Sequence, residues 1–226
     1  MKKIIYTLNI NNYAPELRAL TRPHLEFYAK RIGAEIIDIT ERKYPHMPVV
    51  YEKLQIYDLA QKYRADWNIY IDSDCLIHPE TIDFTNFLDK STVFQVGSDM
   101  AAIRWRYDKY FLRDGRNIGT CNWFTIFSDW CIDLYKPLED MELDEVMQYM
   151  YPTVIERTTV VDTAHLIDDF VLSRNVARYG LKYQNLKELL EKIGLPNANF
   201  FWHEYLITTQ EKVAKAKEVI KLWKIN

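Results

Sequence analysis

The first half of the chain alternates short apolar segments with helix-like segments, and this alternation restricts the fold more than any other feature of the sequence. The apolar segments Lys3–Leu8, Glu35–Thr40 and Trp67–Asp72 have the length and composition of strands. A helical region that ends at Gly33 and an amphipathic helix over Tyr51–Tyr63 lie between them. Strands that alternate with helices predict an α/β fold with a largely parallel central sheet flanked by helices.

The second half is less regular but continues the same fold class. We expect strands over Thr92–Gly97 and Asn122–Phe127, and a strand or extended segment over Asn199–Leu206. Helices are expected over Ser128–Leu138 and over Leu166–Gly180.

The C-terminal segment predicts one more helix. Thr208 and Glu211 have the Thr-x-x-Glu spacing of a capping box, and the helix should continue to about Trp223. The segment from Lys212 to Lys224 carries five lysines, and an apolar side of valine, isoleucine and tryptophan is available. We favour a helix docked on the domain with one wet face. A weak peripheral contact of this basic helix with an anionic membrane is the alternative.

Length and composition favour one compact domain. The chain has 226 residues with 6 Trp, 16 Tyr and 10 Phe, and it shows no repeat or low-complexity linker. We therefore predict a single domain over residues 1–226. A change of character near residue 100 suggests a change of role within this domain, from a nucleotide-type half over about 1–100 to an acceptor-type half with the C-terminal helix over about 101–226.

Charge and cysteine usage restrict partners and location. A formal net charge of −3 gives no basic surface of the kind that nucleic-acid binding requires. Cys75, Cys121 and Cys131 form no CxxC pair, which predicts reduced thiols in a reducing compartment. The N-terminal segment contains too few apolar residues for a signal sequence or a membrane span. We expect a cytoplasmic protein, in a bacterium or, for a viral source, in the host.

The stretch "YIDSD" contains the sharpest chemical signal. Asp72 and Asp74 follow the third strand, at the edge of an open α/β sheet where ligands bind. Side chains two residues apart on a strand point the same way, so both carboxylates can converge on Mg²⁺ or Mn²⁺ and a substrate phosphate. In the alternative interpretation, both carboxylates bond to the backbone of the turn that follows.

These features, taken in order, resemble a known superfamily. The apolar segment with "YIDSD", after a helix with "YEKL", is similar to the Asp-x-Asp segment of glycosyltransferases with the GT-A (Rossmann-like) fold. Downstream, "CNWFTIFSDWCIDLYKPL", "IDDF" and "FFWHEYL" resemble the galactosyl- and xylosyltransferase family that includes galactomannan galactosyltransferases and xyloglucan xylosyltransferases. One departure is Phe170, where members of that family often have Gln after the acidic pair.

The resemblance implies a nucleotide-sugar site with a divalent ion. Asp72 and Asp74 would hold Mn²⁺ or Mg²⁺ on the donor diphosphate, and His203 would complete the metal ligands. Imidazole together with carboxylates favours Mn²⁺. The alternative for His203 is a histidine packed in an aromatic segment and satisfied by one hydrogen bond.

Further donor contacts are expected around the same edge of the sheet. By the resemblance, Thr7 and Asn9 would contact the nucleobase and ribose, and Lys53 the ribose or phosphate. Tyr13 is a candidate for stacking on uracil, and Ser73, between the two aspartates, is grouped with the donor-binding residues. The alternatives are a plain turn for Asn9 and a solvated helix face for Lys53.

The second acidic pair is the candidate for catalysis. Asp168 and Asp169 match the family position that faces the transferred sugar and the acceptor. Their alternative role is to stabilise a helix start, where acidic residues favour the positive end of the helix dipole. Asn117, Gly119 and Asn122 are candidates to bond sugar hydroxyls or, equally, members of an ordinary loop.

The expected function is therefore a metal-dependent glycosyltransferase, either a hexosyl- or a pentosyltransferase. It would move a sugar from a UDP-linked donor to a hydroxyl of a glycan or similar acceptor, with retention of configuration as in the resembling family. Two alternatives stay open. A phosphatase of the haloacid dehalogenase type also has Asp-x-Asp after a strand, normally the first one, and a non-catalytic nucleotide-sugar-binding module would use the same pocket.

Overall fold

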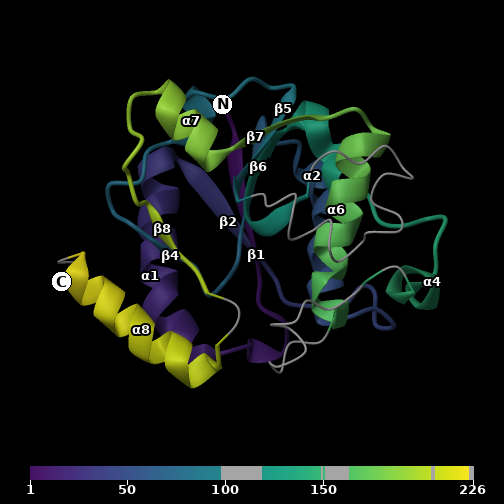
Figure 1. The fold of residues 1–226 in the computed structure, drawn as a ribbon, viewed down its shortest axis with the longest axis horizontal. Coiled ribbons are helices and arrows are strands. Elements are labelled where there is room, and N and C mark those ends of the chain that lie inside the picture. The colour runs from purple at the N-terminus through teal and green to yellow at the C-terminus, as the bar shows by residue number, and fades with distance from the viewer. Residues whose placement is uncertain (98–118, 149, 151–162, 205–206, 224–226) are drawn as a thin grey trace.

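The structure is a computed structural model that describes residues 1–97, 119–148, 150, 163–204 and 207–223. Within these ranges a six-stranded sheet runs through the centre of the molecule, with helices on both faces (Figure 1). In spatial order its strands are β2 (Ala34–Ile39), β1 (Lys3–Leu8), β3 (Trp67–Ile71), β6 (Cys121–Ser128), β5 (Thr92–Gly97) and β7 (Lys182–Asn185).

The sheet is parallel except at one strand. β1 pairs in parallel with β2 and β3, and β5 pairs in parallel with β7. β6 lies between β3 and β5 and is antiparallel to both. The predicted α/β fold with a largely parallel sheet is confirmed. Since β6 separates two strands from the first half of the chain, both halves contribute to one sheet, and the boundary near residue 100 stays a prediction.

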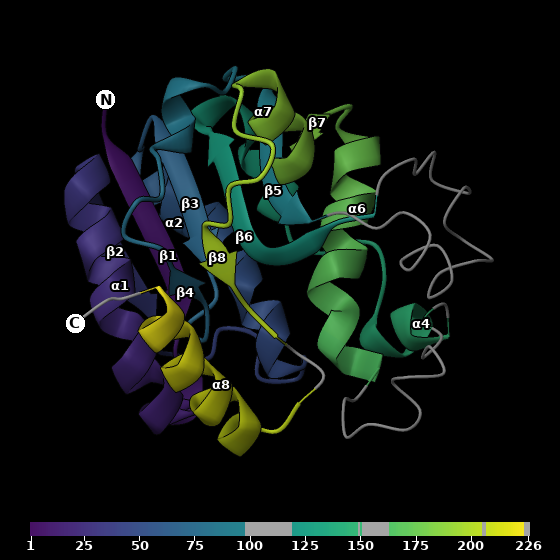
Figure 2. The ribbon, with the colours of Figure 1, turned by 60° about the vertical axis from the view of Figure 1, so that its left-hand side comes forward.

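Helices cover each face of the sheet. α1 (Pro15–Ile32) and α7 (Leu186–Lys192) pack on one face, and α2 (Ile56–Tyr63) and α6 (Ile167–Arg178) pack on the other (Figure 2). The remaining described helices are α4 (Leu143–Met147), α8 (Thr209–Leu222) and the 3-10 helices Ile10–Asn12, Val49–Gln55, Phe84–Asn86, Asp129–Tyr135 and Thr163–Leu166.

The central strands are mostly apolar and do not alternate with polar residues, because both faces of the sheet are covered. On β1, Ile5 packs with α1, while Ile4 and Tyr6 pack on the opposite face with α2. Successive strand side chains point to opposite faces, so a strand covered on both sides needs a continuous apolar run instead of an alternating one. This is why "KIIYTL" is the clearest strand signal in the sequence.

A second, two-stranded sheet lies beside the main one. β4 (Leu76–Ile77) pairs antiparallel with β8 (Phe201–Trp202), Leu76 opposite Trp202 and Ile77 opposite Phe201. The amide of His78 donates to the carbonyl oxygen of Phe200 at 2.8 Å and extends this pairing. The short sheet ties the C-terminal segment to the turn that follows β3.

The predicted helix ends agree with the structure. Gly33 ends α1 with a left-handed φ of 68°, a conformation that a residue without Cβ adopts at little cost. Thr208 and Glu211 form the predicted capping box at the start of α8. A second capping box, between Asn185 and Glu188, opens α7, a helix that the sequence analysis did not predict.

Three predicted elements differ in type or extent. The helix expected over Tyr51–Tyr63 is a 3-10 helix over Val49–Gln55 followed by α2, and the helix expected after Ser128 is also a 3-10 helix. Tertiary contacts override the local periodicity here: the buried carboxylate of Glu52 accepts the backbone N–H groups of Lys43 and Tyr44. The segment Asn199–Leu206 has only the two residues of β8 as strand, and residues 205–206 lie outside the described part.

The C-terminal helix is docked on the domain, as favoured from the sequence. Val213 and Ala216 of α8 pack with Leu17 of α1 and Leu76 of β4, and α8 lies along α1 in Figure 2. The apolar side of this basic helix is therefore covered by protein. Among the described helices, none combines the length and apolarity that crossing a membrane would take.

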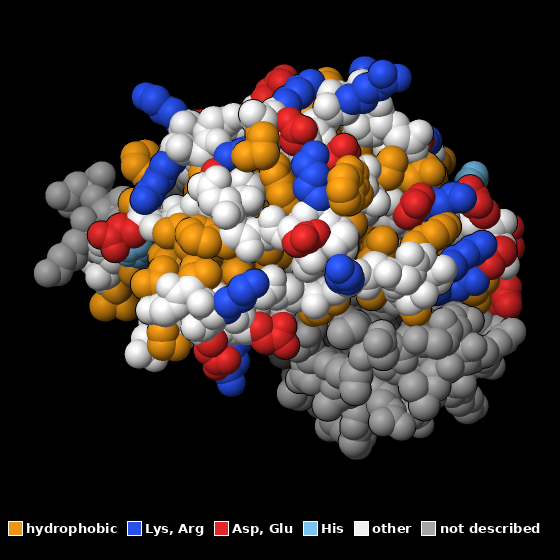
Figure 3. All heavy atoms as spheres, turned by 90° about the horizontal axis from the view of Figure 1, so that it is seen from above, with side chains coloured by type: hydrophobic (Ala, Val, Ile, Leu, Met, Phe, Trp, Pro, Cys, Tyr) orange, Lys and Arg blue, Asp and Glu red, His pale blue; other side chains and the backbone are white. Residues whose placement is uncertain are grey.

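The face of the molecule seen in Figure 3 carries both signs of charge. Lysine and arginine side chains are interspersed there with aspartate and glutamate, and hydrophobic groups lie between them. Mixed charges on this face agree with the formal net charge of −3.

Candidate metal and donor site

The two aspartates of "YIDSD" lie just beyond the carboxyl end of β3. The strand ends at Ile71, and the amide of Asp72 still donates to the carbonyl oxygen of Trp123 at 2.9 Å, so the direction of the strand continues through Asp72. The chain then turns, with the amide of Cys75 donating to the carbonyl oxygen of Asp72. Both carboxylates contact side chains that come from other parts of the fold.

The two-stranded sheet brings His203 to this pair. His203 follows Trp202, the last residue of β8, and the β4–β8 pairing places it across from Cys75, next to Asp74. Its ring stacks on the ring of Trp123, with 4.9 Å between centroids and 11° between planes. The tryptophan therefore fixes the plane of the imidazole.

Asp72, Asp74 and His203 form a cluster with the composition of a metal site. Their ligand atoms all lie within 4.8 Å of one another. His203 Nε2 is 3.3 Å from Asp74 Oδ1 and 3.6 Å from Asp72 Oδ2. Two carboxylates and one imidazole converge here from a strand end and a second sheet. The donor set thus fits a divalent ion.

A lysine that the sequence analysis did not single out also contacts this cluster. Lys212 Nζ of α8 lies 2.5 Å from Asp74 Oδ2, and its side chain is buried. Burial alone would raise the pKa of Asp74, but the hydrogen bond with His203 and the charge of Lys212 outweigh it and hold this pKa well below its usual range. Asp74 is therefore ionised and ready to act as a ligand.

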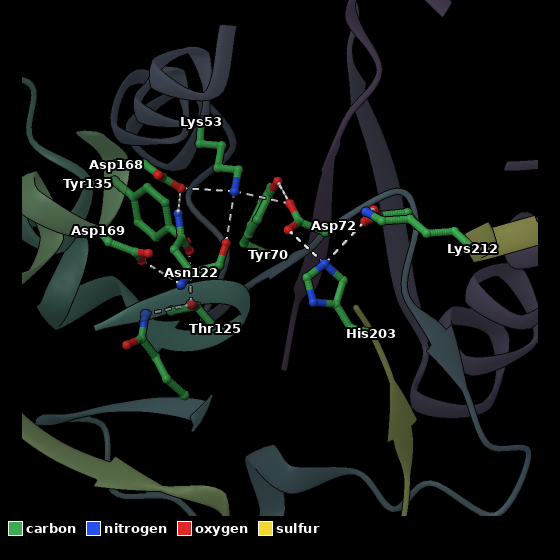
Figure 4. Close-up of polar contacts among 12 residues, drawn as sticks. Lys53, Tyr70, Asp72, Asn122, Thr125, Tyr135, Asp168, Asp169, His203 and Lys212 are labelled. Atoms are coloured by element: carbon green, nitrogen blue, oxygen red, sulfur yellow. Dashed lines mark hydrogen bonds and ion pairs between the residues drawn. The ribbon is translucent and has the colours of Figure 1, made fainter. Parts of the chain in front are cut away.

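Lys53 lies inside the molecule, not on a solvated helix face. Its ammonium is 3.1 Å from Asp72 Oδ1, 2.9 Å from Asp168 Oδ2 and 2.9 Å from the carbonyl oxygen of Asn122 (Figure 4). Burial alone would lower the pKa of Lys53, but the carboxylates of Asp168 and Asp72 outweigh it and hold the pKa well above its ordinary value.

Asp168 and Asp169 occupy the first turn of α6, both buried, and their carboxylates point toward β6. Asp168 Oδ2 accepts from the side-chain amide of Asn122 at 3.3 Å in addition to the Lys53 ion pair, and Asp169 Oδ1 accepts from the backbone N–H of Asn122 at 2.8 Å. Both acids therefore fix the start of β6 against α6, beyond any effect on the helix dipole.

Asn122 is fully engaged inside the protein. Its Oδ1 accepts from the hydroxyl of Tyr135 at 2.6 Å and from Thr125 Oγ1 at 3.1 Å, and the residue is 3% exposed. A direct bond from this amide to a sugar hydroxyl does not fit that arrangement. Gly119 is also buried, and Asn117 lies outside the described residues.

The expected base and ribose residues lie at the carboxyl end of β1. Within the described residues, Thr7 Oγ1 and Asn9 Oδ1 are buried without a hydrogen-bond partner. Thr7 and Ser73 line a small hollow next to Asp72, together with Arg18 and Arg22 of α1. Buried polar atoms without partners are uncommon, and Thr7 lines this hollow, which makes the hollow a candidate ligand position.

The loop from β1 to α1 has an unusual backbone. Asn11, Asn12 and Ala14 have left-handed φ angles of 55°, 50° and 46°, whereas Asn9 itself does not. Asparagine tolerates this region, but alanine is strained there, and such strain concentrates at functional sites. Tyr13, inside this loop, is 49% exposed, so its ring is accessible to a base.

Comparison with known proteins gives structural relatives but no sequence relatives. No protein-family description and no curated protein matches the chain. A glycosyltransferase involved in the glycosylation of the major capsid of PBCV-1 is similar in structure with a TM-score of 0.54, at 12% identity over 96% of this chain and 100% of that one. The galactosyltransferase LgtC, in complex with donor and acceptor sugar analogues, gives a TM-score of 0.48 at 12% identity over 95% of each chain. A197 from STIV gives a TM-score of 0.41 at 13% identity over 82% of each chain. The chain has the GT-A-like fold of glycosyltransferases.

Proposed function

We propose that this protein is a metal-dependent glycosyltransferase that moves a sugar from a nucleotide diphosphate donor to a hydroxyl of a glycan or similar acceptor. The observation that carries the proposal is the convergence of Asp72, Asp74 and His203 at the carboxyl edge of a GT-A-like sheet. Ligands bind at this edge in open α/β folds. The similar structure with a TM-score of 0.54 is a glycosyltransferase involved in the glycosylation of the major capsid of PBCV-1, and it supports the same reaction class.

The metal would be held by Asp72, Asp74 and His203, with Mn²⁺ favoured by the mixed ligand set. When bound, the ion supplies positive charge for the departing diphosphate. Lys212, already at the edge of the cluster, adds a second positive charge in the same place. The resemblance to galactosyl- and xylosyltransferases leads us to propose a UDP-linked hexose or pentose as the donor.

The donor nucleoside would lie along the carboxyl end of β1. Thr7 and Asn9 offer unused polar atoms there, Ser73 lines the hollow beside Asp72, where the diphosphate would lie, and Tyr13 offers an accessible ring. Cys75, Cys121 and Cys131 are free thiols, and we therefore propose that the protein acts in a reducing compartment such as the cytoplasm.

Asp168 and Asp169 would act beside the transferred sugar. Both are held rigidly through Asn122, which keeps their carboxylates in place while donor and acceptor bind. For a retaining reaction the departing diphosphate takes the acceptor proton on the same face of the sugar, and a nearby carboxylate stabilises positive charge at the anomeric carbon. We propose that retention and this stabilising role belong to the present chain.

A thermal-shift experiment tests the proposal. UDP or a UDP-sugar should raise the melting temperature only when Mn²⁺ or Mg²⁺ is present, because the ion connects the diphosphate to the acidic pair. Asp74→Asn should abolish this effect, since it removes one charged ligand at nearly constant size. Equal stabilisation by UDP in chelator and in Mn²⁺ would rule out the metal bridge. Nucleotide binding without sugar transfer to any acceptor or to water would indicate a binding module instead.

A further inference from the structure

The ammonium of Lys53 is enclosed by protein oxygens in the described part of the site. Lys53 is 6% exposed, and its three nearest oxygens, from Asp72, Asp168 and Asn122, lie within 3.1 Å. An ammonium has three N–H donors, so each donor has an acceptor inside the protein. In this arrangement no donor is left for a ribose or a phosphate.

Lys53 contacts only one of the two carboxylate oxygens of Asp72, Oδ1. Lys53 and the hydroxyl of Tyr70 both contact Oδ1 of Asp72, while Oδ2 faces Nε2 of His203. The ring of Tyr70 also lies under the ammonium, with Nζ 5.1 Å from its centroid. One oxygen of the carboxylate is thus committed to the interior, and the other is presented to the metal position.

The other end of the bridge is the first turn of α6. Asp168 shares its Oδ2 between Lys53 and the side-chain amide of Asn122, and the backbone carbonyl of Asn122 is the third acceptor of Lys53. Lys53 therefore joins the strand that carries the acidic pair to the helix that carries Asp168. Figure 4 shows the ammonium between the two carboxylates.

We propose that Lys53 is a positioning residue that connects Asp72 to Asp168. Asp72 then offers only Oδ2 to the metal, and Asp168 keeps a fixed position relative to Asp72. This inference rests on the proposed function, since it concerns how the metal site is built. Residues that orient metal ligands commonly change metal affinity by 10- to 100-fold when they are lost. Lys53 would therefore act on the donor through Asp72, without touching it.

Metal binding by the purified protein tests this role without any sugar transfer. The electron paramagnetic resonance signal of free Mn²⁺ gives the Kd for the wild type and for Lys53→Met, which keeps the side-chain length and removes the charge. We expect Lys53→Met to raise the Kd on the order of tenfold or more.

Lys3 offers a matched control. Its ammonium is also buried, and it contacts a carboxylate, Asp83, and the carbonyl oxygen of Ile32, at the opposite end of β1. Lys3→Met removes a buried charge of the same kind and should leave the Kd for Mn²⁺ unchanged. An equal loss in both variants would show a general effect of destabilisation and overturn the proposal.

A second variant covers the case in which Lys53→Met fails to fold. Tyr70→Phe removes only the hydroxyl that contacts Asp72 Oδ1, with no cavity and no change of charge, and we expect a threefold or larger rise in the Kd, on the order of one lost orienting bond. A wild-type Kd in both Lys53→Met and Tyr70→Phe would overturn the positioning role. Absence of Mn²⁺ binding by the wild type itself would overturn the proposed metal-dependent function, and this inference with it.

The bridge itself has a readout in metal-free protein. With Asp72→Asn or Asp168→Asn alone, Lys53 keeps one charged partner, but the double variant leaves a buried ammonium without any. The midpoint of urea unfolding should therefore fall further in the double variant than the two single shifts add up to. Additive shifts would contradict a shared partner, whatever the outcome for the metal.

Discussion

The imidazole of His203 is the residue on which the proposed metal site can be tested most directly. It lies 3.3 Å from Asp74 Oδ1 and contributes the only nitrogen ligand of the cluster found in the described residues. His203→Ala should raise the Kd for Mn²⁺ on the order of tenfold or more, and excess Mn²⁺ should partly restore UDP binding, since two carboxylates remain. Isothermal titration with Mn²⁺ and UDP measures both effects.

His78 provides the control for that variant. Its ring packs edge-on against Trp223 at 4.9 Å, so His78→Ala removes an aromatic contact of similar size near the same C-terminal segment. The cooperative unfolding transition should persist in both variants, with the loss of Mn²⁺ affinity confined to His203→Ala. Wild-type affinity in His203→Ala would leave this histidine as a packed residue that stacks on Trp123.

At the residue scale, the sequence predicted which residues belong to the site better than it predicted which side chains contact one another. Asp72 and Asp74 could be identified because they follow an apolar strand, and His203 because of a family resemblance; the structure brings the three together. Lys212 could not be identified, because its carboxylate partner lies 138 residues away and the lysines of a basic helix look alike in sequence. The metal-binding role of Asp72, Asp74 and His203 and the catalytic role of Asp168 and Asp169 stay predictions.

The start of α8 couples the stability of an element to the site. Thr208 caps this helix, and Lys212, one residue after Glu211 of the capping box, contacts Asp74. Thr208→Ala should lower the free energy of unfolding by about 1 kcal/mol, because a backbone N–H at the helix start loses its acceptor. It should also weaken Mn²⁺-dependent UDP binding, because fraying of the first turn displaces Lys212. Urea unfolding and a UDP titration measure the two effects.

Asn185 gives the matched comparison, since it forms the same kind of capping box at the start of α7, on a helix without a residue of the candidate site. Asn185→Ala should cost a similar free energy of unfolding, about 1 kcal/mol, and leave UDP binding as it is. If both cap variants bind UDP equally well, the placement of Lys212 by α8 contributes nothing to the donor site.

At the scale of elements, local signals were reliable where local chemistry decides. The end of α1 at Gly33 and the capping box of α8 follow from residues that are close in sequence. The strand β7 was missed because "KYQN" has no apolar alternation and is only a short edge strand. The helix α7, which has only seven residues, was missed as well. In the 3-10 helix over Val49–Gln55, Glu52 bonds to the preceding loop and Lys53 to the distant Asn122, and the local pattern contains neither contact.

The whole molecule shows why the fold class was predictable and the strand order was not. Alternating strands and helices require a sheet covered on both faces, and that much follows from the sequence alone. The insertion of β6, reversed, between β3 and β5 follows from pairing between segments far apart in the chain. This pairing also places Trp123 and Asn122 beside the acidic pair, so the surroundings of the site depend on topology that periodicity does not reveal.

Global stability should depend on pH through a histidine outside the site. The ring of His24 on α1 is half-buried, and Nδ1 lies 3.2 Å from the carbonyl oxygen of Ile77. Burial lowers the pKa of His24 more than the bond to Ile77 raises it, and the nearby His78 lowers it further. Between this lowered pKa and the value of about 6.5 in the unfolded chain, the unfolded state binds more protons. The contribution of the neutral His24 to the free energy of unfolding is therefore fully present above about pH 6.5, and it is lost as the pH falls below that value toward the lowered pKa of the folded state.

Urea unfolding of the metal-free protein at pH 7.5 and at pH 5.5, two conditions on either side of the unfolded-state pKa of about 6.5, measures this loss. His24→Asn keeps a side-chain N–H near the position of Nδ1 but cannot take up a proton, so it should lose less stability between the two conditions than the wild type does. His46→Asn, a substitution at an exposed position, is the matched control and should follow the wild type. If His24→Asn loses as much stability as the wild type between the two conditions, protonation of His24 in the unfolded chain is not what weakens the molecule in acid.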